Sequence, residues 1–172
     1  MNSVFLITFF YVLSIISTLG YGFLFKKFFI KDKIRIDYGV TGLIGIFVLT
    51  FYSYASHFFV AHGLLHNTII IFFGIILFIF FFKSNYERSS LNILILIFLI
   101  LLISLFCFKT HDDFPYYHFP YTNYLTKTDL IVGIGSYDPS WRSPSSIFYF
   151  NSLFFLPIIK FYLFHIGALL IM

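Results

Sequence analysis

The stretch LNILILIFLILLISLFCF, from Leu91 to Phe108, decides the fold. It contains no charged residue and consists almost entirely of isoleucine, leucine and phenylalanine. An α-helix rises about 1.5 Å per residue, so a bilayer core about 30 Å thick needs about 20 apolar residues. The stretch is short by that measure, but its composition predicts a transmembrane helix.

Four further apolar runs accompany this stretch. Three are long enough to cross a bilayer, namely those from about Ser3 to Phe25, Tyr38 to Val60 and Ile147 to Met172. The run from Thr68 to Phe82 is short, and it spans only if the uncharged residues Gly63 to Asn67 lie partly in the interface. The pattern therefore predicts an all-α integral membrane protein with about five transmembrane helices.

Composition supports this class. Hydrophobic residues make up 60% of the chain and charged residues 10%, whereas a soluble domain carries about a quarter charged residues. The net charge of +4 comes from basic residues that cluster in loops, which indicates membrane topology and argues against a nucleic-acid partner. Cys107 is the only cysteine, which excludes an intramolecular disulfide and a thiolate metal site.

The basic residues also predict the orientation. The loop from Lys26 to Arg35 carries five of them and the loop from Lys83 to Ser90 carries two, so both loops are expected to be cytoplasmic. The chain then divides into four transmembrane helices (residues 1–108), an extracytoplasmic polar loop (109–145) and a fifth transmembrane helix (146–172). We expect a multi-pass protein of the inner (cytoplasmic) membrane. Because the chain stops on apolar residues at Met172, we also expect it to be either the N-terminal part of a larger protein or the product of a truncated gene.

The loop from Lys109 to Ser145 is the only long polar stretch, and its first part predicts a short interfacial helix. Asp113 is a good N-cap and Pro115 is tolerated in a first helical turn. Helical spacing would place Asp113 on one face with three tyrosines, which are Tyr117, Tyr121 and Tyr124.

Asp112, Asp113 and His118 are the candidate catalytic residues. One carboxylate could act as a general base or as a cation ligand if burial raises its pKa, with His118 close by. Alternatively, both carboxylates are solvated and simply cap the interfacial helix. These residues identify no definite cofactor, although a divalent cation could bind to one of the carboxylates.

The candidate substrate-binding residues are aromatic and basic. Tyr117, Tyr121 and Trp141 could stack on a sugar ring, or they could form the aromatic belt that is usual at a membrane surface. Arg142 and Lys109 could hold a phosphate, or they could merely bound the adjacent helices.

Polar residues outside the loop have simpler interpretations. His62 and His66 would share one helical face near His57, but histidines without a carboxylate are a weak signal for a metal site. His165 is expected to be a hydrogen-bonded interior residue. Lys160, in the last apolar run, either snorkels to the interface or contacts a lipid phosphate.

The loop resembles the signature region of a family of bacterial multi-pass membrane proteins, which are in turn related to the GT-C type glycosyltransferases. The resemblance covers about Thr110 to Leu156, and its motifs are Asp112-Asp113-x-x-x-Tyr117-His118, Gly133-Ile134-Gly135-Ser136 and Ser145-Ser146. Ser136 replaces the family's usual asparagine, and the later helices of a GT-C core are absent from this chain.

The resemblance implies a catalytic or acceptor-orienting role for Asp112 or Asp113, with Tyr117 and His118 beside it. It also implies a glycosyltransferase that uses polyprenyl-phosphate-linked sugars in cell-envelope glycan synthesis. The expected partners are therefore membrane lipid and a polyprenyl-phosphate-linked sugar. The alternative is a non-catalytic transporter or assembly protein for envelope glycans, although no carboxylate lies deep in a predicted span to favour transport.

Overall fold

The computed structural model describes residues 3–30, 36–106, 112–143 and 145–171, and these residues form helices and turns without a β-strand. Four helices are long and apolar enough to cross a membrane. The all-helical class is therefore confirmed, and the length and composition of these helices indicate a membrane protein. They are α1 (Ser3–Phe29), α2 (Tyr38–His57), α3 (Leu64–Phe82), which continues into the short η1 (Lys83–Asn85), and α4 (Arg88–Phe106).

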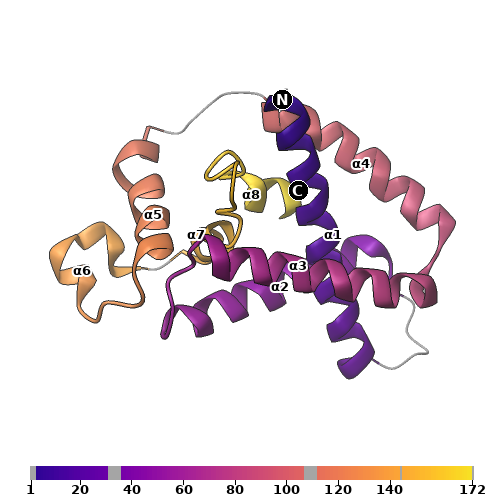
Figure 1. Cartoon of the computed structure of the whole chain (residues 1–172), viewed down its shortest axis with the longest axis horizontal. Helices are drawn as coiled ribbons and strands as arrows, with labels where there is room; N and C mark the ends of the chain where they lie inside the picture. The colour runs from indigo at the N-terminus through magenta and orange to yellow at the C-terminus, as the bar shows by residue number, and fades with distance from the viewer. Residues whose placement is uncertain (1–2, 31–35, 107–111, 144, 172) are drawn as a thin grey trace.

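The rest of the chain forms short helices. α5 and α6 lie beside the end of the α2–α3 pair that is remote from the α3–α4 connection (Figure 1). Two backbone hydrogen bonds attach α5 and the residues that follow it to the α2–α3 turn. One runs from the His62 N–H to the Leu125 carbonyl, and the other from the Leu130 N–H to the His57 carbonyl. The short helices are η2 (Phe114–His118), α5 (Phe119–Lys127), α6 (Ile134–Tyr137), η3 (Pro139–Arg142), α7 (Ser146–Ser152) and α8 (Ile166–Ile171).

The last apolar run differs from the single transmembrane helix expected for it. It forms α7 and α8, which are joined by consecutive turns between Leu153 and His165. Pro157 cannot donate a hydrogen bond to the preceding turn, and the chain reverses there so that the Lys160 N–H bonds to the Leu156 carbonyl. Neither short helix is long enough to cross a bilayer by itself.

Helix α1 is the centre of the fold. Figure 1 shows α1 crossing α2 and α3, and small residues allow these backbones to meet. A side chain added at Gly45 would collide with the Thr18 carbonyl of α1, and one added at Gly74 would collide with Ser17. The Tyr21 hydroxyl donates to the Ile70 carbonyl at 2.8 Å and reinforces the α1–α3 contact.

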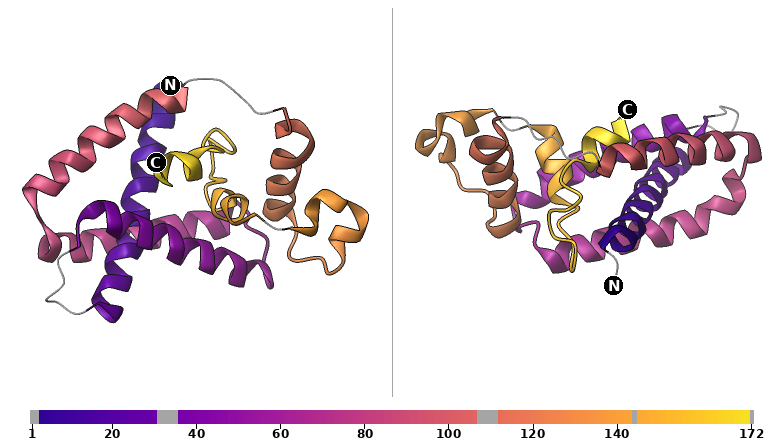
Figure 2. Two further views of the ribbon diagram at one scale, coloured as in Figure 1. Left: turned by 180° about the vertical axis from the view of Figure 1, so that it is seen from behind. Right: turned by 90° about the horizontal axis from the view of Figure 1, so that it is seen from above.

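Helix α4 lies at the periphery. None of its residues is buried, and Figure 2 shows it running at an angle to α1. The Tyr11 hydroxyl donates to the Phe98 carbonyl at 3.2 Å, which anchors α4 to α1. The exposed leucine and isoleucine side chains of α4 suit contact with lipid.

Candidate functional site

The short helix expected after Asp113 is present, with an irregular start. Asp113 occupies the N-cap position, and its carbonyl accepts hydrogen bonds from the N–H groups of Tyr117 (2.8 Å) and His118 (3.3 Å). The first turn is wider than an α-helix, because the Phe119 N–H donates to the Phe114 carbonyl five residues earlier. This wide turn lies directly before Pro120, which has no N–H to donate.

The two candidate carboxylates are not buried. Asp112 and Asp113 are both exposed, and the side chain of Asp113 makes no capping hydrogen bond. The burial that would favour either carboxylate as a general base is therefore absent from the structure.

The predicted row of tyrosines along this helix is confirmed. The ring of Tyr121 lies 6.1 Å from that of Tyr117 and 6.2 Å from that of Tyr124. Trp141 packs on this row, with its ring 5.6 Å from Tyr121 and 5.5 Å from Tyr124. Tyr121 is only 3% exposed, so the middle ring of the row is buried. Burial raises the pKa of Tyr117 and of Tyr121 above the usual range of tyrosine.

A cavity of about 440 Å³ opens beside this aromatic row. Tyr117 and His118 of η2 line it together with Ser145, Asn151 of α7 and His165. The His118 ring lies 5.0 Å from the ring of Phe148, which forms part of the apolar wall. His165 was expected to be a hydrogen-bonded interior residue, but it is exposed and lines this cavity.

The other candidate residues lie outside the cavity. Asp112 and Asp113 do not line it, and Lys109 lies outside the residues that the structure describes. Arg142 donates from Nε to the Gly135 carbonyl at 3.0 Å, so its guanidinium holds the α6–η3 turn. Of the predicted catalytic group, therefore, only His118 reaches the cavity.

The structure contains a buried polar network that the sequence did not predict. His62 contacts the Ser152 hydroxyl through Nδ1 (2.6 Å) and the Ser56 hydroxyl through Nε2 (3.1 Å). Since the Ser152 hydroxyl donates to the Tyr149 carbonyl, His62 Nδ1 carries the proton of its contact with Ser152. Burial, followed by the proximity of His57 and His66, lowers the pKa of His62 to about 3. His62 is therefore neutral at physiological pH.

Asn67 completes the network at the start of α3. Its amide nitrogen contacts the carbonyls of His62 (2.7 Å), Ser152 (2.8 Å) and Phe155 (3.0 Å), and its amide oxygen accepts from His66 Nδ1 (3.0 Å). The network therefore joins the α2–α3 turn to α7. Among the described residues, no group of three or more His, Cys, Asp or Glu side chains is arranged to hold a metal ion.

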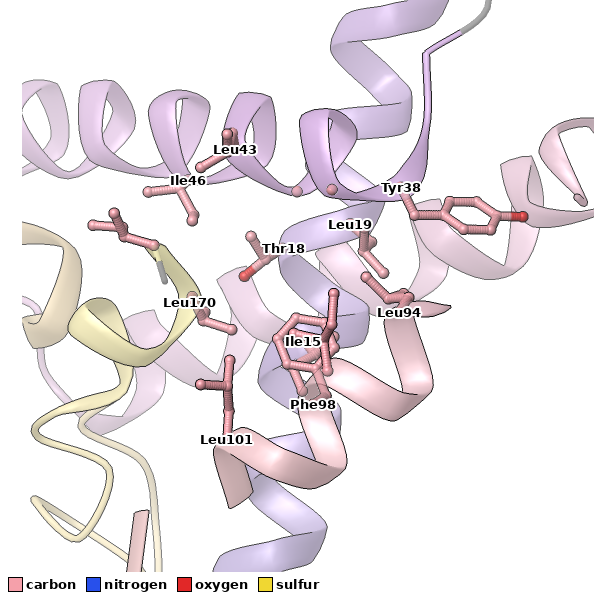
Figure 3. Close-up of a pocket in the computed structure, with 14 residues that line it drawn as sticks. Ile15, Thr18, Leu19, Tyr38, Leu43, Ile46, Leu94, Phe98, Leu101 and Leu170 are labelled. Carbon is pink, nitrogen blue, oxygen red and sulfur yellow. The ribbon is translucent and has the colours of Figure 1, made fainter. Parts of the chain in front are cut away.

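A second cavity, of about 170 Å³, is apolar. It lies between α1, α2, α4 and α8, and Figure 3 shows aliphatic side chains such as Ile15, Leu94 and Leu101 around it. Its two hydroxyls are already engaged, because Thr18 donates to the Ser14 carbonyl and Tyr38 donates to the Asn85 carbonyl. This cavity therefore offers hydrocarbon contact and no reactive group.

No protein-family model, curated protein or solved structure matches this chain. Its function must therefore be inferred from its own residues.

Proposed function

We propose that this chain is part of a GT-C-like membrane glycosyltransferase that binds a polyprenyl-phosphate-linked sugar in the cavity between η2 and α7. The observation that carries the proposal is the composition of this cavity. Aromatic, amide, hydroxyl and imidazole groups, represented by Tyr117, Asn151, Ser145 and His118, converge on one space of about 440 Å³. This volume lies within the usual range of small-ligand sites, and a sugar ring presents both apolar faces and hydroxyls to such a lining.

Glycosyl transfer requires a base at the acceptor. The acceptor oxygen forms a bond to the anomeric carbon of the sugar while the bond from that carbon to the phosphate oxygen breaks. The acceptor proton passes to the base, and the phosphate leaves as an anion. His118 is the best candidate for the base because it lines the cavity, whereas the carboxylates of Asp112 and Asp113 are exposed outside it.

The placement in the membrane is part of the proposal. Lys26 and Lys27 lie with Ser84 and Asn85 at one end of the long helices, whereas the tyrosine row lies beside the α2–α3 turn at the other end. If the basic end faces the cytoplasm, as is usual, the sugar site faces outward across the inner membrane. Polyprenyl-phosphate sugars would then reach the cavity from the outer leaflet.

The binding step can be tested with the single tryptophan of the chain. Trp141 packs on the tyrosine row beside the cavity, so its fluorescence should change when short-chain polyprenyl-phosphate hexoses are added to the purified protein. Tyr117→Leu should weaken this response, and the matched control Tyr137→Leu should retain it because Tyr137 is 89% exposed and does not line the cavity. Equal responses from the two variants, or none from the unmodified chain, would argue against the site.

The chemical step is tested in the producing cell. His118→Gln should still bind the sugar donor but lower envelope glycosylation by about 10²-fold to 10⁴-fold, the usual cost of losing a general base. Asp112→Asn and Asp113→Asn, at the same expression level, show whether an exposed carboxylate shares the role. If all three variants retain normal glycosylation, the site only binds, as in a transporter or an assembly protein.

A further inference from the structure

A second polar pocket lies at the opposite end of the long helices. It is formed where the end of α1 meets η1, and its cavity measures about 130 Å³. Lys26 and Lys27 of α1 line one side, Ser84 and Asn85 of η1 line the other, and the buried Phe23 contributes apolar wall.

Hydrogen bonds hold η1 in position against the start of α2, which in turn packs on α1. The Tyr38 hydroxyl donates to the Asn85 carbonyl at 2.8 Å and accepts from the Glu87 N–H at 3.0 Å. Tyr38 also packs on Phe23, with a ring separation of 5.9 Å. The Asn85 side chain donates to the Phe81 carbonyl at 2.9 Å. The pocket is therefore built by fixed contacts between α1, η1 and the start of α2.

The described wall of the pocket carries positive charge from Lys26 and Lys27. Among the residues that the structure describes, no aspartate or glutamate lines the pocket, and neither Lys26 nor Lys27 forms an ion pair. The end of α1 contributes about half a negative charge, which is smaller than the two full positive charges of the lysines. The net positive charge of the pocket therefore favours the binding of an anion.

The surroundings indicate the class of anion. Phe28 and Phe29 follow the lysines directly and are 74% and 73% exposed, at the end of a helix that is long enough to cross a membrane. A ligand that placed its charge between the lysines would bring any attached hydrocarbon against these rings. Basic pockets between helices at a membrane surface commonly bind phospholipid headgroups.

We propose that this pocket binds the phosphate of an anionic phospholipid, with the acyl chains alongside Phe28 and Phe29. The site is separate from the sugar cavity and does not depend on the proposed enzymatic function. The ordinary preference for basic residues in cytoplasmic loops would also place lysines here, but it would not require them to share a pocket with Ser84 and Asn85.

The test compares two double variants of the full chain, purified and delipidated in a neutral detergent. Lys26→Gln with Lys27→Gln removes two charges from the pocket. Lys83→Gln with Arg88→Gln, the loop variant, removes two charges from the α3–α4 connection at residues that do not line the pocket. Native mass spectrometry then measures binding of phosphatidylglycerol, with phosphatidylcholine as the neutral reference. The pocket variant should bind phosphatidylglycerol about 30-fold more weakly than the unmodified chain, as expected for two basic residues, and the loop variant should bind almost normally.

A third variant separates the pocket from its charge. Ser84→Phe fills the cavity while leaving every lysine in place, so it should also weaken phosphatidylglycerol binding, whereas Lys26→Arg with Lys27→Arg should retain it. Circular dichroism at the same temperature identifies any variant that has unfolded. Equal losses in the pocket and loop variants would overturn the proposal, and so would unchanged binding in Ser84→Phe. Inorganic phosphate that binds as tightly as phosphatidylglycerol would overturn the assignment to a lipid.

Discussion

Acidification is expected to destabilise the fold through His62. In the folded protein this side chain is fully buried and its pKa is lowered to about 3, whereas in the unfolded chain the ordinary value of 6.5 applies. The unfolded state therefore binds a proton between these values and the folded state does not. Stability contributed by neutral His62 is complete above the unfolded pKa and is lost as the pH falls toward the folded pKa.

The size of the effect follows from the two pKa values. Each pH unit between them costs about 1.4 kcal/mol, so lowering the pH from about 7 to about 5 should remove about 2 kcal/mol of unfolding free energy through this residue. That is a substantial fraction of the stability of an ordinary domain, which is about 5–15 kcal/mol.

The assay is equilibrium unfolding in mixed micelles of a mild detergent and dodecyl sulfate, followed by circular dichroism at several pH values. His62→Gln lacks the titrating group, so its unfolding free energy should depend on pH less steeply than that of the unmodified chain, by about 2 kcal/mol over the same interval. The comparison of slopes cancels the histidines that both proteins share. If the two slopes coincide, or if acid stabilises the unmodified chain, His62 is not held neutral by burial.

Two further predictions concern packing and topology. Gly45→Ala should destabilise the α1–α2 contact by about 1–3 kcal/mol in the same unfolding assay, because the added Cβ would overlap the Thr18 carbonyl. The control Gly42→Ala should be tolerated, because the nearest atom to its added Cβ would lie at 3.8 Å. Equal losses of stability in the two variants would contradict the close approach of α1 and α2 at Gly45. Cysteines placed at Ser136 and Ser84, in a Cys107→Ser background, should react with a membrane-impermeant reagent from outside and inside the cell respectively, and the reverse pattern would place the sugar cavity on the wrong side.

Local features of the chain were predictable from the sequence alone. The four long helices follow from apolar runs, because burial of hydrocarbon in a bilayer and internal hydrogen bonding act within each run without help from distant residues. The short helix after Asp113 and the row of Tyr117, Tyr121 and Tyr124 follow from capping chemistry and helical periodicity, which are also local.

Features that depend on distant contacts required the tertiary structure. The run from Ile147 to Met172 is apolar throughout most of its length, yet it folds into α7 and α8 because Pro157 interrupts it and the turns between pack into the core. The sequence likewise did not predict which candidate site residues line the cavity between η2 and α7. His118 meets His165 there, whereas Asp112 and Asp113 remain exposed, and burial depends on which segments cover a residue.

The buried histidine network shows this dependence on distant contacts most clearly. The spacing of His62 and His66 predicted that they share one helical face; their rings do stack at 5.2 Å, but His62 lies before α3 begins at Leu64. Their partners could not be read from that spacing, because Ser152 lies 90 residues from His62 along the chain. The sequence by itself therefore determined the membrane class, the long helices and the local helical faces. Only the tertiary structure decided which polar groups are buried, and with what partners, because those energies depend on segments that folding alone brings together.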